Sequence, residues 1–342
     1  MRALAKTKPA PGLTMIEAPR PRIAPDEVLI RVKRASICGT DLHIWKWDAW
    51  AEENLSLPVI AGHEFSGEIV EIGERVARVL AVGQRVSGEG HIVDLNSTAA
   101  RAGRPHLDPA TKGIGVHRDG AFADYIALPA FNVIALPDAV SLEVGAMLDP
   151  FGNAVHAAQQ FNLMGEDVLI TGAGPIGIMA AMVARHAGAR SVVLTDRNAW
   201  RLELAGRLVD VRTVNIEQED VKSVMAQEGV TDGFGVALEM SGAQAAIAQC
   251  LKFLAMGGKL AMLGLPAKAM EVNWSDIILK AITIKGVYGR EMFETWRTML
   301  GLLHAGLDLT PLITHRIAAD EYQTAFEQAL SGLAGKVVMD WS

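Results

Sequence analysis

Cysteine is scarce in this sequence, which contains two among its 342 residues, Cys38 and Cys250. Two cysteines so far apart in the chain cannot supply the disulfide framework that stabilises small secreted domains. The sequence therefore predicts a protein of a reducing compartment, and we expect it in the cytoplasm.

Long hydrophobic runs are also missing. The first residues, MRALAKTKPAPG, contain no apolar stretch of the kind that forms a signal peptide. The most apolar window, Val168–Ala184, is interrupted by three glycines and a proline and is shorter than the ~20 residues that a membrane-spanning helix needs. We therefore expect a buried strand, a tight turn and a buried helix in this window, and no membrane partner.

An excess of positive charge is absent as well. The chain has 32 Lys and Arg against 39 Asp and Glu, which gives a formal net charge of -7. Because nucleic acids and anionic membranes attract basic patches, this balance argues against both as partners. The 50% of hydrophobic and 21% of charged residues are typical of a globular protein, and 342 residues predict two domains.

The hydrophobic pattern changes along the chain. Glu27–Lys33 alternates between polar and apolar residues, Gly62–Ile72 is a second predicted strand, and short strands between turn residues are typical of a partly open barrel or a sandwich. In the middle of the chain, apolar runs rich in β-branched residues recur, and each is a predicted strand. Helical patterns, such as Ile178–His186 and Arg201–Leu208, lie between most of these runs. These runs are Asp167–Thr171, Ser191–Thr195, Val211–Val214, Gly235–Met240, Lys259–Leu263 and Ile282–Val287.

Strands that alternate with helices in this way are typical of an α/β fold with a doubly wound parallel sheet. We therefore place a nucleotide-binding domain at residues 150–289. Residues 1–149 and 290–342 would form a discontinuous, β-rich second domain whose last strand is Lys336–Met339.

A glycine-rich turn follows the first strand of the predicted parallel sheet. Its residues are Gly172, Ala173, Gly174, Pro175, Ile176 and Gly177, and a helical pattern comes next. In a G-x-G-x-x-G turn the glycines permit a close approach of the backbone to a pyrophosphate, and the helix N-terminus supplies N–H donors. The position predicts a Rossmann dinucleotide site.

Asp196 ends the next predicted strand, about 20 residues after the turn, where an acid accepts hydrogen bonds from the ribose. A carboxylate there repels a 2′-phosphate, which favours NAD over NADP. Arg197 beside it is a feature of NADP sites, and we judge Asp196 to be the stronger signal because it occupies the strand end.

A second group of residues has the composition of a metal site. Cys38 follows a predicted strand, and His63 and Glu64 come about 25 residues later. A thiolate, an imidazole and a carboxylate are suited to a catalytic zinc ion with an open position. The wider pattern from Gly62 is G-H-E-x2-G-x5-G-x2-V.

This pattern, followed by the nucleotide-binding fold, resembles the zinc-containing medium-chain dehydrogenase/reductase family over essentially the whole chain. The resemblance implies a GroES-like catalytic domain beside the Rossmann domain, and oxidation of an alcohol by hydride transfer to NAD. It implies that Cys38 and His63 bind the catalytic zinc, with Glu64 as a ligand or an exchangeable neighbour. Thr40 and His43 match the hydroxyl and the imidazole that pass the substrate proton to solvent.

Further segments are similar to the branch of the family that oxidises the 3-hydroxyl of L-threonine to give 2-amino-3-oxobutanoate. These are Gly88–His91, Asp149–His156, Tyr288–Trp296 and Ile313–Arg316. The resemblance makes Asp149 an acid close to the zinc, either a ligand or a member of the proton relay. It also implies a homotetramer and contacts with NAD from Ile176, Asp196, Arg201, Leu263, Gly264, Leu265, Val287 and Tyr288.

Two further residues have competing interpretations. Arg290 either clamps the substrate carboxylate with its planar guanidinium or is a surface arginine at the start of a helix. His91 either lies over the substrate pocket or is a buried structural histidine.

The chain departs from the family at the structural zinc site. The family carries a second zinc held by four cysteines, and the matching positions here are Asp94, Ser97, Ala100 and Asp108. These side chains cannot form a thiolate cage, so we expect one zinc per subunit and a lobe held together by packing.

The sequence leaves two alternatives open. One is another zinc-dependent polyol or secondary-alcohol dehydrogenase, and the other is an inactive scaffold that binds NAD. Metal analysis and NADH formation from threonine, sorbitol and ethanol separate these possibilities.

Overall fold

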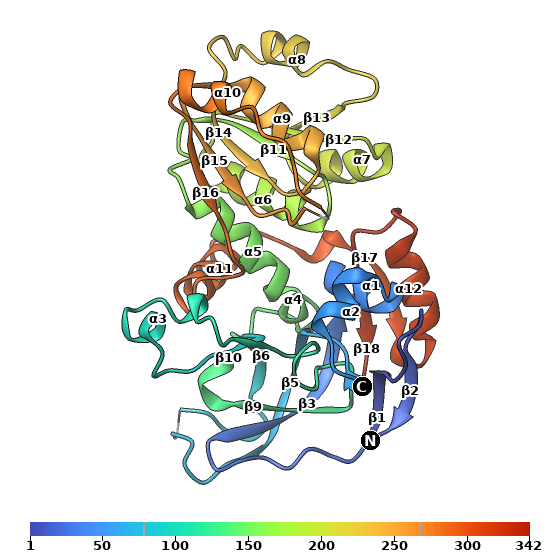
Figure 1. Ribbon diagram of the computed structural model, residues 1–342. Coiled ribbons are helices and arrows are strands. Elements are labelled where there is room, and N and C mark those ends of the chain that lie inside the picture. Colours follow the sequence, from blue (N-terminus) through green and yellow to red (C-terminus); the bar gives the residue numbers. More distant parts are fainter. Residues whose placement is uncertain (78, 267) are drawn as a thin grey trace. The chain divides into compact units, whose positions relative to one another are not determined.

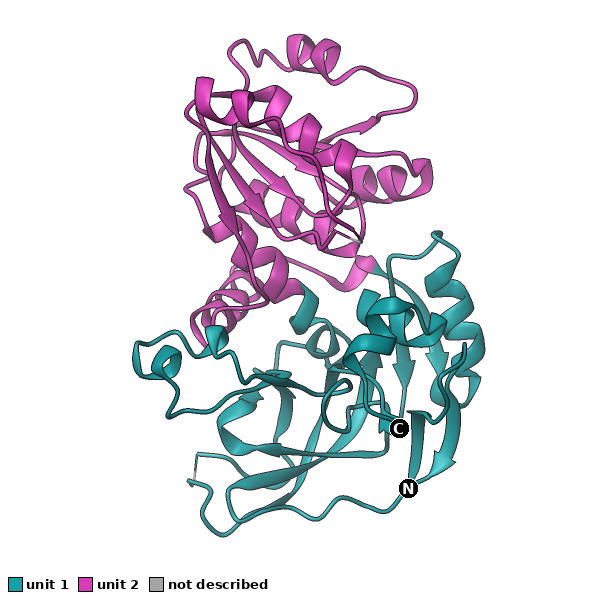
Figure 2. Cartoon of the chain, viewed as in Figure 1, with its two compact units in different colours: residues 1–150, 313–342 teal, residues 151–312 magenta. Residues whose placement is uncertain are grey.

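The computed structural model describes residues 1–77, 79–266 and 268–342 (Figure 1). Contacts between residues divide the chain into two compact units, shown in different colours in Figure 2: unit 1 comprises residues 1–150 and 313–342, and unit 2 comprises residues 151–312. Among the described residues, no helix has both the length and the apolar character that crossing a membrane requires.

The units differ from the expected domains at Pro150, which lies in unit 1, and in residues 290–312, which lie in unit 2. The helix in this segment, α11 (Glu294–His304), is joined to α5 (Leu148–Gln159) by a 2.9 Å hydrogen bond from Gln159 Nε2 to Thr298 Oγ1. The contact that keeps α11 with α5 in unit 2 carries no local signal in the sequence, and the chain returns to unit 1 only at Ile313.

Unit 1 is built on a sheet of seven strands within the described part of the chain. Their order is β10 (Val133–Ala135), β6 (Arg85–Gly88), β5 (Glu64–Ile72), β3 (Glu27–Ser36), β18 (Lys336–Asp340) and β17 (Ile313–Ala318), and β9 (Tyr125–Pro129) also pairs with β3. Val28, Leu29 and Ile30 of β3 are completely buried, so the predicted alternating strand is the centre of the core.

The pairing around β3 brings distant segments together. Ser36, at the end of β3, lies opposite Glu64 of β5 and opposite Val338 of β18. The start of β5, the end of β3 and the start of β18 therefore meet at one edge of the sheet.

Smaller elements complete unit 1. One further sheet has the strand order β2 (Thr14–Glu17), β1 (Arg2–Lys6) and β4 (Val59–Ile60). Another consists of β7 (His91–Ile92) and β8 (Lys112–Gly113). The helices are α1 (Gly39–Lys46), α2 (Ala49–Asn54), α3 (Thr98–Arg101), α4 (Leu142–Ala146) and α12 (Tyr322–Leu330), with short 3-10 turns η1 (Pro105–Leu107), η2 (Ala130–Asn132) and η4 (Ala319–Glu321). Trp45 of α1 stacks on Phe326 of α12 with ring centroids 4.4 Å apart, which fixes α1 against the sheet's C-terminal helix.

Unit 2 contains the predicted doubly wound sheet. Its described strands are all parallel and follow the order β13 (Arg212–Asn215), β12 (Ser191–Asp196), β11 (Asp167–Thr171), β14 (Phe234–Glu239), β15 (Leu254–Met262) and β16 (Thr283–Gly286). The helices are α5, α6 (Pro175–His186), α7 (Ala199–Leu208), α8 (Val221–Gln227), α9 (Gln244–Phe253), α10 (Trp274–Leu279) and α11, with the 3-10 turn η3 (Thr310–Leu312); residues of α5 up to Pro150 belong to unit 1.

Both faces of this sheet are covered. Leu169 and Val193 pack in one core cluster with α8 and α9 residues such as Ile247. Their strand neighbours Val168 and Leu194 point to the opposite face because side chains alternate along a strand, and they are buried as well. Because both faces of the sheet are buried, successive residues of each strand are apolar, and the strands form continuous apolar runs in the sequence.

Candidate metal centre and cofactor site

The predicted metal ligands come together in unit 1. Cys38 follows β3 and caps the N-terminus of α1, while His63 and Glu64 stand at the start of β5. One potential ligand atom from each of the three residues lies within 4.8 Å of the other two. The register between β3 and β5 thus produces the set that the sequence predicts.

Glu64 shows how this set fits a metal ion. The side chain is completely buried, and its Oε2 atom accepts hydrogen bonds from Ser36 Oγ and from Lys336 Nζ, the latter at 2.5 Å. Its Oε1 atom is buried without a hydrogen-bond partner. A buried carboxylate oxygen with no donor, beside a thiol and an imidazole, matches the donor chemistry of zinc.

Asp41 supports His63 from α1. It is completely buried, its Oδ1 atom lies 3.8 Å from His63 Nδ1, and its Oδ2 atom accepts a 2.9 Å hydrogen bond from the Cys38 N–H. Burial raises the pKa of Asp41 to about 6. For His63, burial alone would lower the pKa, but the negative groups of Cys38 and Asp41 raise it well above its ordinary value.

A local field that favours positive charge at His63 also favours a cation at the ligand set. Carboxylates behind a histidine ligand commonly orient the ring and strengthen metal binding. We did not predict Asp41 from the sequence. The available signal was its place three residues after Cys38, where its side chain returns to the Cys38 backbone.

The predicted proton-relay residues lie on α1. Thr40 Oγ1 is 3.9 Å from Cys38 Sγ. The His43 side chain is 54% exposed, and its Nδ1 atom lies 2.5 Å from Asp48 Oδ2. One relay residue is therefore next to the metal set, and the other reaches solvent.

Asp48 is a further residue that sequence reasoning missed. It caps α2 by accepting a hydrogen bond from the Ala51 N–H. Burial would raise its pKa, but the hydrogen bonds from His43 and Ala51 outweigh burial, and the pKa lies below its ordinary value. Asp48 is thus an anionic partner that orients the His43 ring.

The other predicted catalytic residues are buried or half-buried. Asp149, at the start of α5, is 6% exposed, and its negative charge contributes to the raised pKa of His63. His91, on β7, has a side chain that is 25% exposed and lies 2.7 Å from Glu89 through Nδ1.

Arg290 of unit 2 is 2% exposed, so it is not a surface arginine. Its Nη1 donates to Asn153 Oδ1 at 3.3 Å. Gly152 leaves room for it, because a Cβ atom there would lie 2.3 Å from Arg290 Cδ.

The glycine-rich turn of unit 2 has the predicted form. Gly172 follows β11 with a φ of +95°, and α6 starts at Pro175. A Cβ on Gly177 would lie 1.8 Å from the Gly172 carbonyl oxygen, so only glycine permits this close packing of helix on strand. The Asp196 Oδ2 atom accepts a 2.7 Å hydrogen bond from the Ala173 N–H and ties the turn to β12.

The remaining predicted cofactor residues lie at the carboxyl ends of neighbouring parallel strands. Leu263, Gly264 and Leu265 follow β15, and Val287 and Tyr288 follow β16. This edge is where open parallel sheets bind their ligands.

Arg201, on α7, has a buried Nε atom without a hydrogen-bond partner. A buried, unpartnered donor of this kind fits an anionic or hydroxyl-rich ligand. Ile176 lies in the first turn of α6.

The lobe that lacks cysteines is ordered around Asp108. This residue is 4% exposed, and its two carboxylate oxygens accept hydrogen bonds from the N–H groups of Asp94, at 2.7 Å, and Ala110, at 3.1 Å. Ser97 caps α3 by accepting from the Ala100 N–H. Hydrogen bonds from backbone N–H groups to the Asp108 and Ser97 side chains therefore hold residues 94–110 together.

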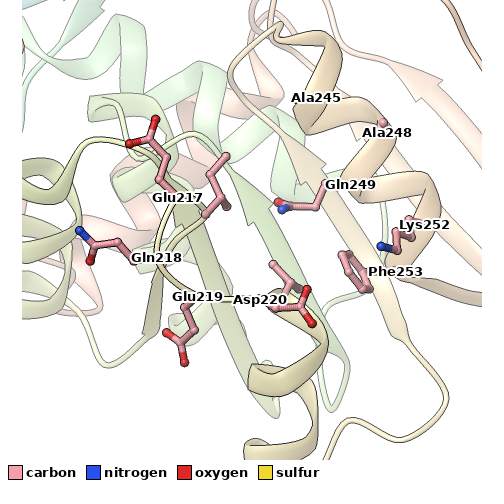
Figure 3. Close-up of a pocket in the computed structure, with 11 residues that line it drawn as sticks. Glu217, Gln218, Glu219, Asp220, Ala245, Ala248, Gln249, Lys252 and Phe253 are labelled. Atoms are coloured by element: carbon pink, nitrogen blue, oxygen red, sulfur yellow. The ribbon is translucent and has the colours of Figure 1, made fainter.

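A hollow of about 590 Å3 lies on unit 2, beside the loop between β13 and α8 (Figure 3). Ile216, which lines the hollow, donates its backbone N–H to the Asp196 backbone carbonyl. Glu217, Glu219 and Asp220 line the hollow, and Lys252 is on α9. Three carboxylates disfavour an anionic ligand, and the described lining includes none of the predicted cofactor or metal residues.

Two stretches of the chain match known protein families. Residues 24–138 match the alcohol dehydrogenase GroES-like domain, and residues 175–305 match the family described as zinc-binding dehydrogenase. The first match covers Cys38, His63 and Glu64, and the second begins in the glycine-rich turn.

Similar whole chains give the same picture. L-threonine 3-dehydrogenase of Ruegeria pomeroyi is 58% identical, with 100% of both chains covered. Among solved structures, 2R,3R-butanediol dehydrogenase from Bacillus subtilis has a TM-score of 0.89 at 26% identity, covering 99% of each chain. A protein from Sinorhizobium meliloti, described as a zinc-binding dehydrogenase and solved with NADP bound, has a TM-score of 0.90 at 28% identity, covering 99% of this chain and 98% of that one.

Proposed function

Because this chain belongs to the zinc-binding medium-chain dehydrogenase family, we propose that it oxidises L-threonine to 2-amino-3-oxobutanoate and transfers the hydride to NAD. The observation that carries the proposal is the convergence of Cys38, His63 and Glu64 within 4.8 Å, in a chain 58% identical to an L-threonine 3-dehydrogenase.

Cys38, His63 and Glu64 would hold the zinc ion, which when bound lowers the pKa of the substrate hydroxyl, as zinc lowers the pKa of water to about 7. Asp41 would add a negative charge behind His63, with its Oδ1 atom 3.8 Å from His63 Nδ1. Asp149 places a second acid near the set, as a ligand or as a member of the relay.

Thr40 is the first acceptor of the substrate proton in this proposal. His43 passes the proton to solvent, which its 54% exposure permits. Asp48 fixes Nδ1 of the ring, so that Nε2 is the atom that exchanges the proton during turnover.

NAD is the proposed cofactor, and when bound it would supply the acceptor for the hydride. The Asp196 carboxylate favours a ribose 2′-hydroxyl over a 2′-phosphate, although the Sinorhizobium meliloti protein was solved with NADP. The turn Gly172–Gly177 would bind the pyrophosphate, together with contacts from Arg201, residues 263–265 and residues 287–288. Arg290 is the residue that we propose binds the substrate carboxylate, because a buried guanidinium forms strong bidentate hydrogen bonds with a carboxylate.

We also propose a homo-oligomer, a tetramer by the family resemblance. The support is the open edge of the unit 2 sheet, where the residues of β16 are exposed. On α10, Ile278 and Leu279 are 71% and 74% exposed. An open strand edge beside exposed apolar side chains suits pairing with a second copy.

The test is NADH formation from L-threonine, sorbitol and ethanol, together with elemental analysis. We expect a clear preference for threonine and one zinc per chain. A preference for sorbitol or ethanol identifies a different dehydrogenase of the family, and zinc-free protein that binds NAD without turnover identifies a scaffold. Light scattering at several concentrations measures the oligomer.

A further inference from the structure

The turn between β6 and β7 holds a carboxylate and an imidazole in direct contact. Glu89 is completely buried, and its Oε1 atom accepts a 3.0 Å hydrogen bond from the His91 N–H and lies 2.7 Å from His91 Nδ1. One carboxylate oxygen therefore contacts both the backbone and the ring of the same residue, which limits the rotation of the imidazole.

Asn132 fixes the backbone of this turn. Its buried side-chain amide donates to the backbone carbonyls of Glu89, at 2.9 Å, and His91, at 2.8 Å. The backbone carbonyl of Asn132 accepts from the Glu89 N–H at 2.8 Å. The two residues that present the carboxylate and the imidazole are thus held at a set spacing.

Gly90, between Glu89 and His91, places the turn beside the predicted metal ligand His63. A Cβ atom on Gly90 would lie 3.8 Å from His63 Cβ and 3.8 Å from Asp149 Oδ2. The Glu89 side chain is 0% exposed and the His91 side chain 25%, so the side chain of His91 is accessible in part, whereas the carboxylate is not.

The contact with Glu89 also selects the form of the ring. With Nδ1–H donating to a carboxylate, the neutral imidazole carries its lone pair on Nε2, which is then a hydrogen-bond acceptor. A neutral ring backed by a carboxylate has a net negative charge. Such a pair favours a cationic donor over an anion.

We propose that Glu89 is a positioning residue that holds His91 to accept a hydrogen bond from the protonated amine of the substrate. The substrate class is then amino alcohols with an ammonium group on the carbon next to the hydroxyl. The inference rests on the proposed function, since it assigns the group that distinguishes threonine from a simple secondary alcohol.

The test is Glu89→Gln, which keeps the size of the side chain and removes its charge. Kinetics are measured with L-threonine and with 3-hydroxybutanoate, which has hydrogen in place of the ammonium group. We expect KM for threonine to rise about 10- to 100-fold, the range for loss of a charge-assisted hydrogen bond, with a smaller change in kcat. KM for 3-hydroxybutanoate and the zinc content should stay unchanged.

Glu71→Gln is the matched control, since Glu71 is an exposed carboxylate of the same unit, on β5. It should leave all values unchanged. An unchanged threonine KM in Glu89→Gln, or equal losses with both substrates, overturns the inference. Wild-type protein that oxidises another alcohol but not threonine contradicts the proposed function instead.

A second measurement does not depend on the folding of a variant. Competitive inhibition of the wild-type enzyme is compared for 2-aminobutanoate and butanoate, which differ in the ammonium group. We expect 2-aminobutanoate to bind at least about tenfold more tightly, and His91→Gln to reduce this ratio. Equal inhibition by the two compounds contradicts recognition of the amine.

Discussion

Lys336 and Glu64 are 272 positions apart in the chain, and their side chains form a buried ion pair. Lys336 Nζ lies 2.5 Å from Glu64 Oε2 and also donates to the Ile37 carbonyl at 2.7 Å, next to Cys38. The Lys336 side chain is 3% exposed and that of Glu64 is 0% exposed. A cation from β18 thus offsets the charge of a predicted metal ligand from β5.

Lys336→Met should strengthen zinc binding and destabilise the zinc-free protein. Without the ammonium group, a metal cation is the remaining neighbour that can offset the Glu64 charge, and removing one partner of a buried pair costs about 3–5 kcal/mol. Zinc release to a chelator and the thermal midpoint with and without zinc measure the two effects. Lys33→Met is the control, because Lys33 pairs with Glu68 at 3.9 Å near the surface. Faster zinc release from Lys336→Met would contradict this view of the pair.

Asp196→Asn should narrow the preference for NAD over NADP by about tenfold, which corresponds to ~1.4 kcal/mol. The amide keeps an acceptor for the Ala173 N–H and removes the charge that repels a 2′-phosphate. Asp196→Ala also removes the acceptor, so it should weaken the binding of both cofactors. The ratio of kcat/KM for the two cofactors is the measurement, and equal use of both by the wild-type protein would count against the assignment.

Elemental analysis should find one zinc per chain, and a chelator should stop activity without unfolding the lobe around Asp108. Asp108→Ala should loosen that lobe, because two backbone N–H groups lose their acceptor at about 1–3 kcal/mol each when they stay buried. Hydrogen exchange over residues 94–113 and tryptic cleavage after Arg101 report the change. Two zinc ions per chain would show that the lobe holds metal.

Lys6 predicts a pH dependence of stability. Burial lowers its pKa to about 8, and its ammonium group lies 5.2 Å from the centre of the Trp47 ring. Between pH 8 and the ordinary lysine pKa of about 10.5, the unfolded chain binds the proton more strongly than the folded one, so unfolding free energy rises with pH. We expect wild type to gain stability relative to Lys6→Met from pH 8 to pH 10 in denaturant titrations. A constant difference would mean that Lys6 titrates normally in the folded state.

The sequence predicted those parts of the site that depend on local patterns. Cys38, His63 and Glu64 were recognised because together they supply a thiolate, an imidazole and a carboxylate within the pattern G-H-E-x2-G-x5-G-x2-V, and Asp196 because it ends a predicted strand. The strand Asp167–Thr171 has the predicted bounds. β15 begins at Leu254, earlier than predicted, because Gly257 and Gly258 interrupt its apolar pattern.

The supporting residues were missed for a different reason. Lys336 reaches Glu64 through the register of β18 on β3, which no local pattern encodes. Asp41 and Asp48 are close in sequence to the residues they support, but acids at helix starts are common as caps, so their position alone does not indicate a role at the metal.

The place of β18 inside the sheet of unit 1 has a consequence for biosynthesis. The ribosome makes residues 336–340 after all of residues 151–312, so unit 2 is available to fold while the sheet of unit 1 still lacks an internal strand. The ion pair between Glu64 and Lys336 likewise cannot form until β18 has been synthesised. The buried surroundings of Glu64 are therefore completed only after the whole of unit 2 has been translated, although Cys38, His63 and Glu64 all precede that unit in the chain.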